Sequence, residues 1–222
     1  MKEALVEKTL RVIEEISKME FPKLFYLVGG TALSLQIKHR LSEDLDFMCW
    51  QKTKKYKQNI DLQAIRNEIS KFFTINKIDI LEYNHIELYI ENDVKLSFYA
   101  PEKREPKINP VHYLNNLILC DIECIAALKM EVMLRRNEFR DYYDIYSILQ
   151  DKNIDLQNII DNSLKYSQHN LKSKNLIGML TNSDRFKQSC DFLQLNPKYN
   201  ISSKDIESFL IKKLSSICII KK

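Results

Sequence analysis

The fold follows from a segment that begins with Phe25-Tyr-Leu-Val-Gly-Gly-Thr31 and ends, one helix length later, with Asp44-Leu-Asp46. The apolar run before the glycines predicts a buried strand, and the glycine pair predicts a turn from that strand into a helix. A second apolar run predicts the strand that carries the two aspartates. Because successive side chains alternate between the faces of a strand, both carboxylates point the same way, roughly 7 Å apart along the backbone, and the leucine between them points into the core.

This combination of residues indicates phosphoryl chemistry. Two carboxylates on one face can share a hard divalent cation, and magnesium usually takes one or two protein carboxylates together with water and nucleotide phosphate oxygens. Gly29 and Gly30, two of only three glycines in the chain, allow the backbone to approach a ligand, and the following helix presents free N–H groups to an anion. We therefore expect a metal site at Asp44 and Asp46. On spacing alone, solvent-facing positions on an edge strand stay open as the alternative.

Two blocks of sequence resemble a known family. The first block contains Leu27-Val-Gly-Gly-Thr-Ala-Leu33 and Arg40-Leu-Ser-Glu-Asp-Leu-Asp-Phe47. The second contains Ala126-Ala-Leu-Lys-Met-Glu131, Arg136 and Arg140-Asp-Tyr-Tyr-Asp-Ile145. Both resemble the motifs of AbiEii/AbiGii-type nucleotidyltransferases, a branch of the DNA polymerase β-like nucleotidyltransferase superfamily. The matched motifs leave the last third of the chain unassigned.

The resemblance implies roles for residues of both blocks. The implied catalytic residues are Asp44, Asp46, Lys129, Asp141 and Asp144, with the metal on Asp44 and Asp46, and the implied nucleotide-binding residues are Gly29, Gly30, Thr31, Ser42, Lys129 and Arg140. Some alternatives stay open. Thr31 either donates to a phosphate or caps the helix, and Ser42 is favoured as a turn residue over a phosphate contact. For Asp141 and Asp144, the family role is metal ligand or proton acceptor, although the helix dipole alone accounts for Asp141.

Lys129 stands out on a helical projection of its segment. It falls between Ile122, Ile125, Val132 and Met133, on the apolar face of the predicted helix. A lysine in that position must either extend its ammonium to solvent or meet an anion. The resemblance favours the anion, with the ammonium at the nucleotide phosphates.

One position departs from the superfamily pattern. A third carboxylate commonly comes from a later strand, but here the matching strand, Val94-Lys-Leu-Ser-Phe98, carries Ser97. Three interpretations are open. Two carboxylates hold the metal, or Asp79, Glu87 or an aspartate of the later motif completes the site, or the protein binds nucleotide without efficient turnover.

The rest of the chain predicts an α+β protein with a polymerase β-like nucleotidyltransferase domain, a mixed sheet with flanking helices, followed by an all-helical bundle. Alternating residues predict an antiparallel meander over about 74–100, and proline-rich residues 101–110 mark the domain boundary. We therefore expect an α/β domain over 1–108 and a helical domain over 109–222. The predicted helices lie at about 3–19, 31–38, 59–73, 121–136, 138–150, 155–169, 172–180, 184–193 and 203–217.

Composition narrows the class of protein. The net charge of +4 permits a nucleic-acid partner without requiring one. Five cysteines without C-x-x-C spacing argue against a zinc ribbon and against a disulfide framework. The sequence has no secretory or membrane-spanning run, so we expect a cytoplasmic protein. The lysine-rich loop 51–57, with Tyr56, could hold a triphosphate or RNA, although a solvated loop is the favoured interpretation, and the four scattered histidines receive no role.

The resemblance implies a magnesium-dependent enzyme that transfers a nucleoside monophosphate from a nucleoside triphosphate to an acceptor and releases pyrophosphate. Family members are toxins of bacterial toxin–antitoxin or abortive-infection systems, so a tRNA or other RNA acceptor and a cognate antitoxin are the implied partners. Transfer to a small molecule or a protein is the first alternative. A catalytically lapsed nucleotide-binding regulatory module is the second.

Overall fold

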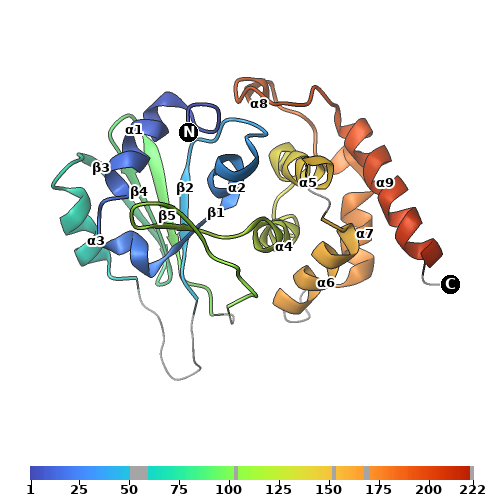
Figure 1. Cartoon of the computed structure of the whole chain (residues 1–222), viewed down its shortest axis with the longest axis horizontal. Coiled ribbons are helices and arrows are strands. Elements are labelled where there is room, and N and C mark those ends of the chain that lie inside the picture. The colour runs from blue at the N-terminus through green and yellow to red at the C-terminus, as the bar shows by residue number, and fades with distance from the viewer. Residues whose placement is uncertain (51–59, 103–104, 152–153, 168–170, 221–222) are drawn as a thin grey trace. The chain divides into compact units, whose positions relative to one another are not determined.

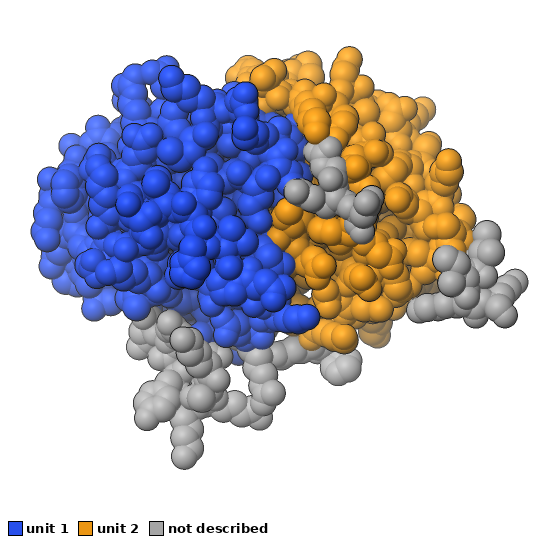
Figure 2. All heavy atoms as spheres, viewed as in Figure 1, with its two compact units in different colours: residues 1–121 blue, residues 122–222 orange. Residues whose placement is uncertain are grey.

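The computed structural model describes residues 1–50, 60–102, 105–151, 154–167 and 171–220. The chain divides into two compact units, Met1–Asp121 and Ile122–Lys222 (Figure 2). We call these unit 1 and unit 2 and describe each by itself.

Unit 1 is built on a mixed sheet whose described strands lie in the order β3-β4-β5-β2-β1-β7-β6. The strands are β1 (Tyr26–Val28), β2 (Leu45–Met48), β3 (Ile75–Glu82), β4 (His85–Ile90), β5 (Val94–Tyr99), β6 (Val111–Leu114) and β7 (Leu117–Leu119). Strand β2 pairs antiparallel with β1 and parallel with β5. The antiparallel pairs β3/β4 and β4/β5 confirm the meander predicted from the alternating sequence.

Helices cover both sides of this sheet. They are α1 (Glu7–Ile16), α2 (Gly29–Ile37) and α3 (Leu62–Ile69), with a 3-10 turn η1 at Phe21–Leu24. Figure 1 shows α1 and α3 on one side of the sheet and α2 on the other. Helix α3 starts at a local signal, because the Asp61 carboxylate accepts a hydrogen bond from the Ala64 N–H and so caps the first turn.

The core of unit 1 is aromatic and lies on one face of β2 and β5. Phe47 and Phe98, paired in the strand register, stack with ring centroids 5.3 Å apart, and Phe21 and Phe25 meet them edge-on. Burial of each such side chain stabilises the fold by roughly 1.5–3 kcal/mol. Since strand side chains alternate, the same packing turns the polar residues of β2 and β5 to the opposite face.

The division between the units differs from the predicted boundary at 108/109. Unit 1 continues to Asp121 because β6 and β7, which the sequence reading assigned to no strand, join the sheet. Strand β7 pairs parallel with β1, where Leu119 lies opposite Leu27. The proline-rich segment therefore precedes the last hairpin of the sheet and does not end the unit.

Every regular element described in unit 2 is helical, which confirms the predicted fold class. These elements are α4 (Ile122–Val132), α5 (Phe139–Asp151), α6 (Leu156–Tyr166), α7 (Ser173–Leu180), η2 (Ser183–Arg185), α8 (Cys190–Leu193) and α9 (Ser203–Ile220). The helix predicted over 184–193 was wrong in extent, because η2 and the single turn α8 replace it. No helix among the described residues has both the length and the apolar character needed to cross a bilayer.

Candidate active site

The glycine turn that opens α2 is filled by two side chains of unit 1. Gly29 has φ +69, and a Cβ atom added to it would lie 2.4 Å from Asp46 Oδ2. A Cβ on Gly30 would lie 2.5 Å from Arg40 Nη2. Gly29 therefore needs glycine for its backbone conformation, and at both positions a Cβ atom would displace the end of the neighbouring side chain. The sequence predicted room for a ligand, whereas the space closest to the glycines holds a carboxylate and a guanidinium of the protein itself.

Thr31 and Ser42 connect this turn to the aspartate strand. The Thr31 hydroxyl is buried, lies 2.9 Å from Ser42 Oγ and also donates to the Asp44 carbonyl oxygen. The Ser42 backbone in turn exchanges hydrogen bonds with the N-terminal segment, through Val6 N–H and the Ala4 carbonyl. Partners within the protein thus satisfy the Thr31 hydroxyl, which ties the turn to β2 and does not cap α2.

Asp44 and Asp46 lie on the polar face of β2. Both are partly exposed, while Leu45 between them and Phe47 after them are buried. This is the arrangement expected from strand alternation. Asp46 Oδ2 lies 2.4 Å from the position that a Cβ atom of Gly29 would take. Its carboxylate is therefore beside the first turn of α2.

Strand register extends this polar face across the sheet. Asp46 lies opposite Ser97 on β5, Ser97 lies opposite Glu87 on β4, and Glu87 lies opposite Asp79 on β3. Ser97 therefore does occupy the neighbouring-strand position at which a third carboxylate was sought. The next carboxylate in the same row is Glu87, one strand further on, and Asp79 lies beyond it and pairs with Lys77.

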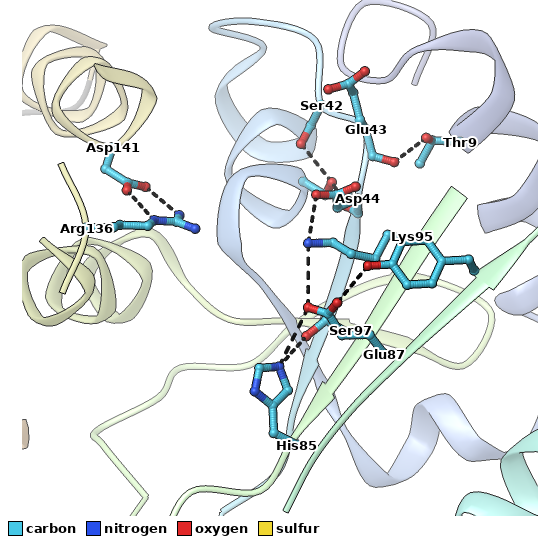
Figure 3. A network of polar contacts seen from close by, with 12 residues as sticks. Thr9, Ser42, Glu43, Asp44, His85, Glu87, Lys95, Ser97, Arg136 and Asp141 are labelled. Carbon is cyan, nitrogen blue, oxygen red and sulfur yellow. Dashed lines mark hydrogen bonds and ion pairs between the residues drawn. The ribbon is translucent and has the colours of Figure 1, made fainter. Parts of the chain in front are cut away.

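Lys95 joins the carboxylates of this face (Figure 3). Its Nζ lies 3.3 Å from Asp44 Oδ2 and 3.8 Å from Glu87 Oε1. Burial alone would lower the pKa of Lys95, but Asp44, Asp46 and Glu87 together raise it. The sequence reading gave Lys95 no role, although alternation along β5 already placed it on the same face as Ser97.

Two further side chains complete the network around Glu87. The Tyr89 hydroxyl donates to Glu87 Oε2 at 2.8 Å, which leaves Oε1 towards Lys95. His85 Nε2 lies 3.9 Å from Glu87 Oε1 and 3.4 Å from Ser97 Oγ. The histidine that the sequence left without a role is therefore a member of the polar face.

The carboxylates of this face suit a hard cation. Within the described residues, no group of three or more His, Cys, Asp or Glu side chains is arranged to hold a metal ion. Asp44 and Asp46 nevertheless offer oxygen donors from one partly exposed face of β2. Magnesium commonly takes one or two carboxylates and keeps several waters, so this donor set fits magnesium better than a metal that needs a complete protein cage.

The second sequence block forms a buried charge cluster in unit 2. Lys129 Nζ, on α4, lies 3.0 Å from Asp141 Oδ1 and 2.6 Å from Asp144 Oδ2, both on α5. Arg136 binds Asp141 with two nitrogens, Nε at 2.8 Å and Nη2 at 3.1 Å. Of the two alternatives for Lys129, the ammonium meets an anion, and the anions are aspartates of its own unit.

Electrostatics favour the ionised form of Asp141. Burial would raise the pKa of Asp141, but Lys129 and Arg136 outweigh burial and lower it. Arg140, which precedes Asp141, has a buried Nε with no hydrogen-bond partner among the described residues. The lysine-rich loop 51–57 with Tyr56 lies outside the described residues, as does His169.

Comparison with known sequences identifies a family and a relative of the chain. A family model described as "Nucleotidyl transferase AbiEii toxin, Type IV TA system" matches residues 11–215. An uncharacterized protein of Aquifex aeolicus (strain VF5) is 24% identical over 157 residues, which cover 70% of this chain and 72% of that protein.

Comparison with solved structures shows the fold. The chain resembles MenT4, the nucleotidyltransferase toxin Rv2826c from Mycobacterium tuberculosis H37Rv, with TM-score 0.60 and 15% identity over 96% of this chain and 84% of that one. It also resembles a crystal structure from H. pylori, provisionally described as a nucleotidyltransferase, with TM-score 0.57 and 18% identity over 96% and 99% of the two chains.

Proposed function

Because the chain belongs to the AbiEii family of nucleotidyl transferase toxins, we propose that it is a magnesium-dependent nucleotidyltransferase with tRNA as its favoured acceptor. In this reaction an acceptor hydroxyl attacks the α-phosphorus of a nucleoside triphosphate. A new phosphoester bond forms, the bond to the β-phosphate oxygen breaks, and pyrophosphate leaves. The proposed biological role is the toxin of a bacterial toxin–antitoxin or abortive-infection pair, with a cognate antitoxin as partner.

The observation that carries the proposal is the meeting of the paired aspartates with the start of α2. Asp44 and Asp46 would hold magnesium, which when bound neutralises phosphate charge and orients the triphosphate. The N-cap residue of α2, Val28, has no side-chain oxygen to cap the first turn, and N–H groups at a helix start suit a phosphate oxygen. Gly29 and Gly30 keep this turn free of side chains of their own, while Thr31 fixes the turn to the Asp44 backbone.

The buried cluster of unit 2 is the second group that we assign to the reaction, on the resemblance of its motif. Asp141 and Asp144 hold the Lys129 ammonium from two sides, so its position is fixed before any ligand binds. Fixed charges of this kind lower the cost of reorganisation during phosphoryl transfer. Arg140 is the candidate nucleotide-binding residue of this group, because its buried Nε has no hydrogen-bond partner among the described residues.

The test is incubation of the purified protein with magnesium, total tRNA and each labelled nucleoside triphosphate in turn. The Asp44→Asn/Asp46→Asn variant keeps side-chain size and removes both charges. Asp93→Asn is the matched control, because Asp93 is exposed in the turn between β4 and β5 and its φ of 58 is one that asparagine tolerates. Label on tRNA with the parent and the control, but not with the double variant, is the expected result.

Other outcomes identify the alternatives. Label on a small molecule or on a protein would retain nucleotidyl transfer and replace the acceptor. Metal-dependent nucleotide binding without any product would contradict the proposed reaction and favour the lapsed regulatory module. Ser97 opposite Asp46, where the superfamily commonly has a carboxylate, is the observation that makes this last alternative worth testing.

A further inference from the structure

Lys95 lies among three carboxylates of the face proposed to bind metal. Its Nζ is close to Asp44 and Glu87, and the charge of Asp46 also acts on it. These four side chains carry three negative charges and one positive charge. Without nucleotide or metal, Lys95 offsets part of this negative charge among the described residues.

The contacts of Lys95 are loose for an ion pair. Its distances of 3.3 and 3.8 Å exceed the roughly 2.7–2.9 Å of a strong charged hydrogen bond, and its side chain is 28% exposed. Partly exposed pairs of this kind contribute little to stability. The ammonium thus lies between two carboxylates without being tightly bound to either, and water has access to it.

Glu87 is oriented towards the same position. Tyr89 holds its Oε2, so Oε1 faces Lys95, and the Glu87 side chain is only 17% exposed. Between Glu87 and Asp46 in the strand register stands the short side chain of Ser97. The carboxylate that β5 lacks at Ser97 is therefore matched by Glu87 on β4, whose Oε1 points towards the Lys95 ammonium.

We propose that Lys95 is a tethered cation that competes with the divalent metal for Asp44, and that Glu87 is the third carboxylate acting on that metal. This inference rests on the proposed function, since it assumes that Asp44 and Asp46 bind the ion. With the ion bound, Lys95 would leave Asp44 Oδ2, and Glu87 would contribute its charge to the ion through water rather than as a direct ligand. Lys95 then keeps the acidic face together while metal is absent.

The proposal predicts opposite effects for two substitutions of similar size. Lys95→Met removes the competing charge and should tighten metal binding about tenfold, or about 1.4 kcal/mol. Glu87→Gln removes an attractive charge and should weaken binding by about the same factor. The probe is Mn²⁺ alone, titrated into the purified full chain and followed by the loss of the free-ion electron paramagnetic resonance signal.

Lys77→Met is the matched control. Lys77 lies on β3, pairs with Asp79 at 2.6 Å and, on substitution, changes the net charge by the same amount as Lys95→Met. It should alter Mn²⁺ affinity by less than about twofold, because its side chain is exposed, pairs with Asp79 rather than Asp44, and is screened by solvent. Lys95→Gln serves as a second variant, and the circular dichroism spectrum of each protein establishes that it is folded.

The outcomes separate this inference from the proposed function. Asp46→Asn abolishing Mn²⁺ binding, with Lys95→Met no different from Lys77→Met, would overturn the tethered-cation inference and leave the proposed function standing. Weaker binding in Lys95→Met and Lys95→Gln would overturn it too, and would make Lys95 a residue that supports the metal. If neither the parent nor any variant binds Mn²⁺, both proposals fail.

Discussion

Unit 1 and unit 2 each place a lysine between two carboxylates, but the two clusters differ in distance and in exposure. Lys129 lies 2.6 and 3.0 Å from its aspartates with 7% of its side chain exposed, whereas Lys95 lies 3.3 and 3.8 Å from its carboxylates with 28% exposed. The tight, dry cluster is part of the packing of α4 against α5. The more exposed cluster, in our proposal, exchanges its lysine for the metal ion. If so, the same residue types serve a fixed role in one unit and a replaceable role in the other.

The difference between the two clusters is tested most directly by replacing each lysine. Lys129→Met leaves two buried carboxylates without their shared cation and should destabilise the protein by about 3–5 kcal/mol. Lys95→Met should cost less than about 1 kcal/mol, since partly exposed pairs contribute little. Urea denaturation followed by circular dichroism measures both. Equal losses in the two variants would show that the clusters do not differ in the way their burial implies.

The glycines offer a second contrast between the units. Gly29→Ala should cost about 1–3 kcal/mol, because φ +69 is strained for alanine and its Cβ would meet Asp46 Oδ2. Gly178 lies inside α7 with no described atom within 4 Å of an added Cβ, so Gly178→Ala should stabilise by about 0.5–1 kcal/mol. Urea midpoints of the two variants test the signs. A neutral Gly29→Ala would mean that the turn relaxes, and that the glycine is not needed to seat Asp46.

Sequence reasoning succeeded in unit 1 where the signal was local. The glycine pair, the alternation around Leu45 and the meander over 74–100 depend on neighbours in the chain, and each is found in the structure. The sequence did not predict strands β6 and β7, because both are short and because β7 pairs with β1 across a long sequence separation. No local pattern records such a pairing.

The residues of the candidate sites were likewise predicted only where the signal was local in the sequence. Glu87 was among the residues considered for a third carboxylate, but nothing local singled it out from Asp79. Only the register of β4, β5 and β2 brings Glu87 and Lys95 towards Asp44. In unit 2, helical periodicity placed Lys129 on an apolar face, while its aspartate partners come from the next helix and required the packing of α4 on α5.

Acid should weaken the buried cluster of unit 2 and so reduce the stability of the protein. The pKa of Asp141 is lowered in the folded protein by Lys129 and Arg136, against the effect of burial. Its contribution to stability is therefore complete above the ordinary aspartate pKa of about 3.9 and is lost as the pH falls towards the lowered value. The urea midpoint, measured from neutral pH into strong acid, should therefore decrease as the pH drops below about 3.9. The decline should be smaller in Asp141→Asn, and an unchanged decline in that variant would assign acid sensitivity to other groups.

The smallest expected effect concerns the orientation of Glu87. Tyr89→Phe removes one part-buried hydrogen bond to Glu87 Oε2, which should change the free energy of unfolding by about 1 kcal/mol. If Oε1 is held towards the cation by that bond, Mn²⁺ affinity should still fall about twofold to threefold, or about 0.4–0.7 kcal/mol. Tyr83→Phe is the matched control, because the Tyr83 hydroxyl also donates to a carboxylate, that of Glu102. A loss of Mn²⁺ affinity in Tyr89→Phe and none in Tyr83→Phe would separate orientation of the metal site from general stability, whereas equal affinities would mean that Glu87 finds its position without Tyr89.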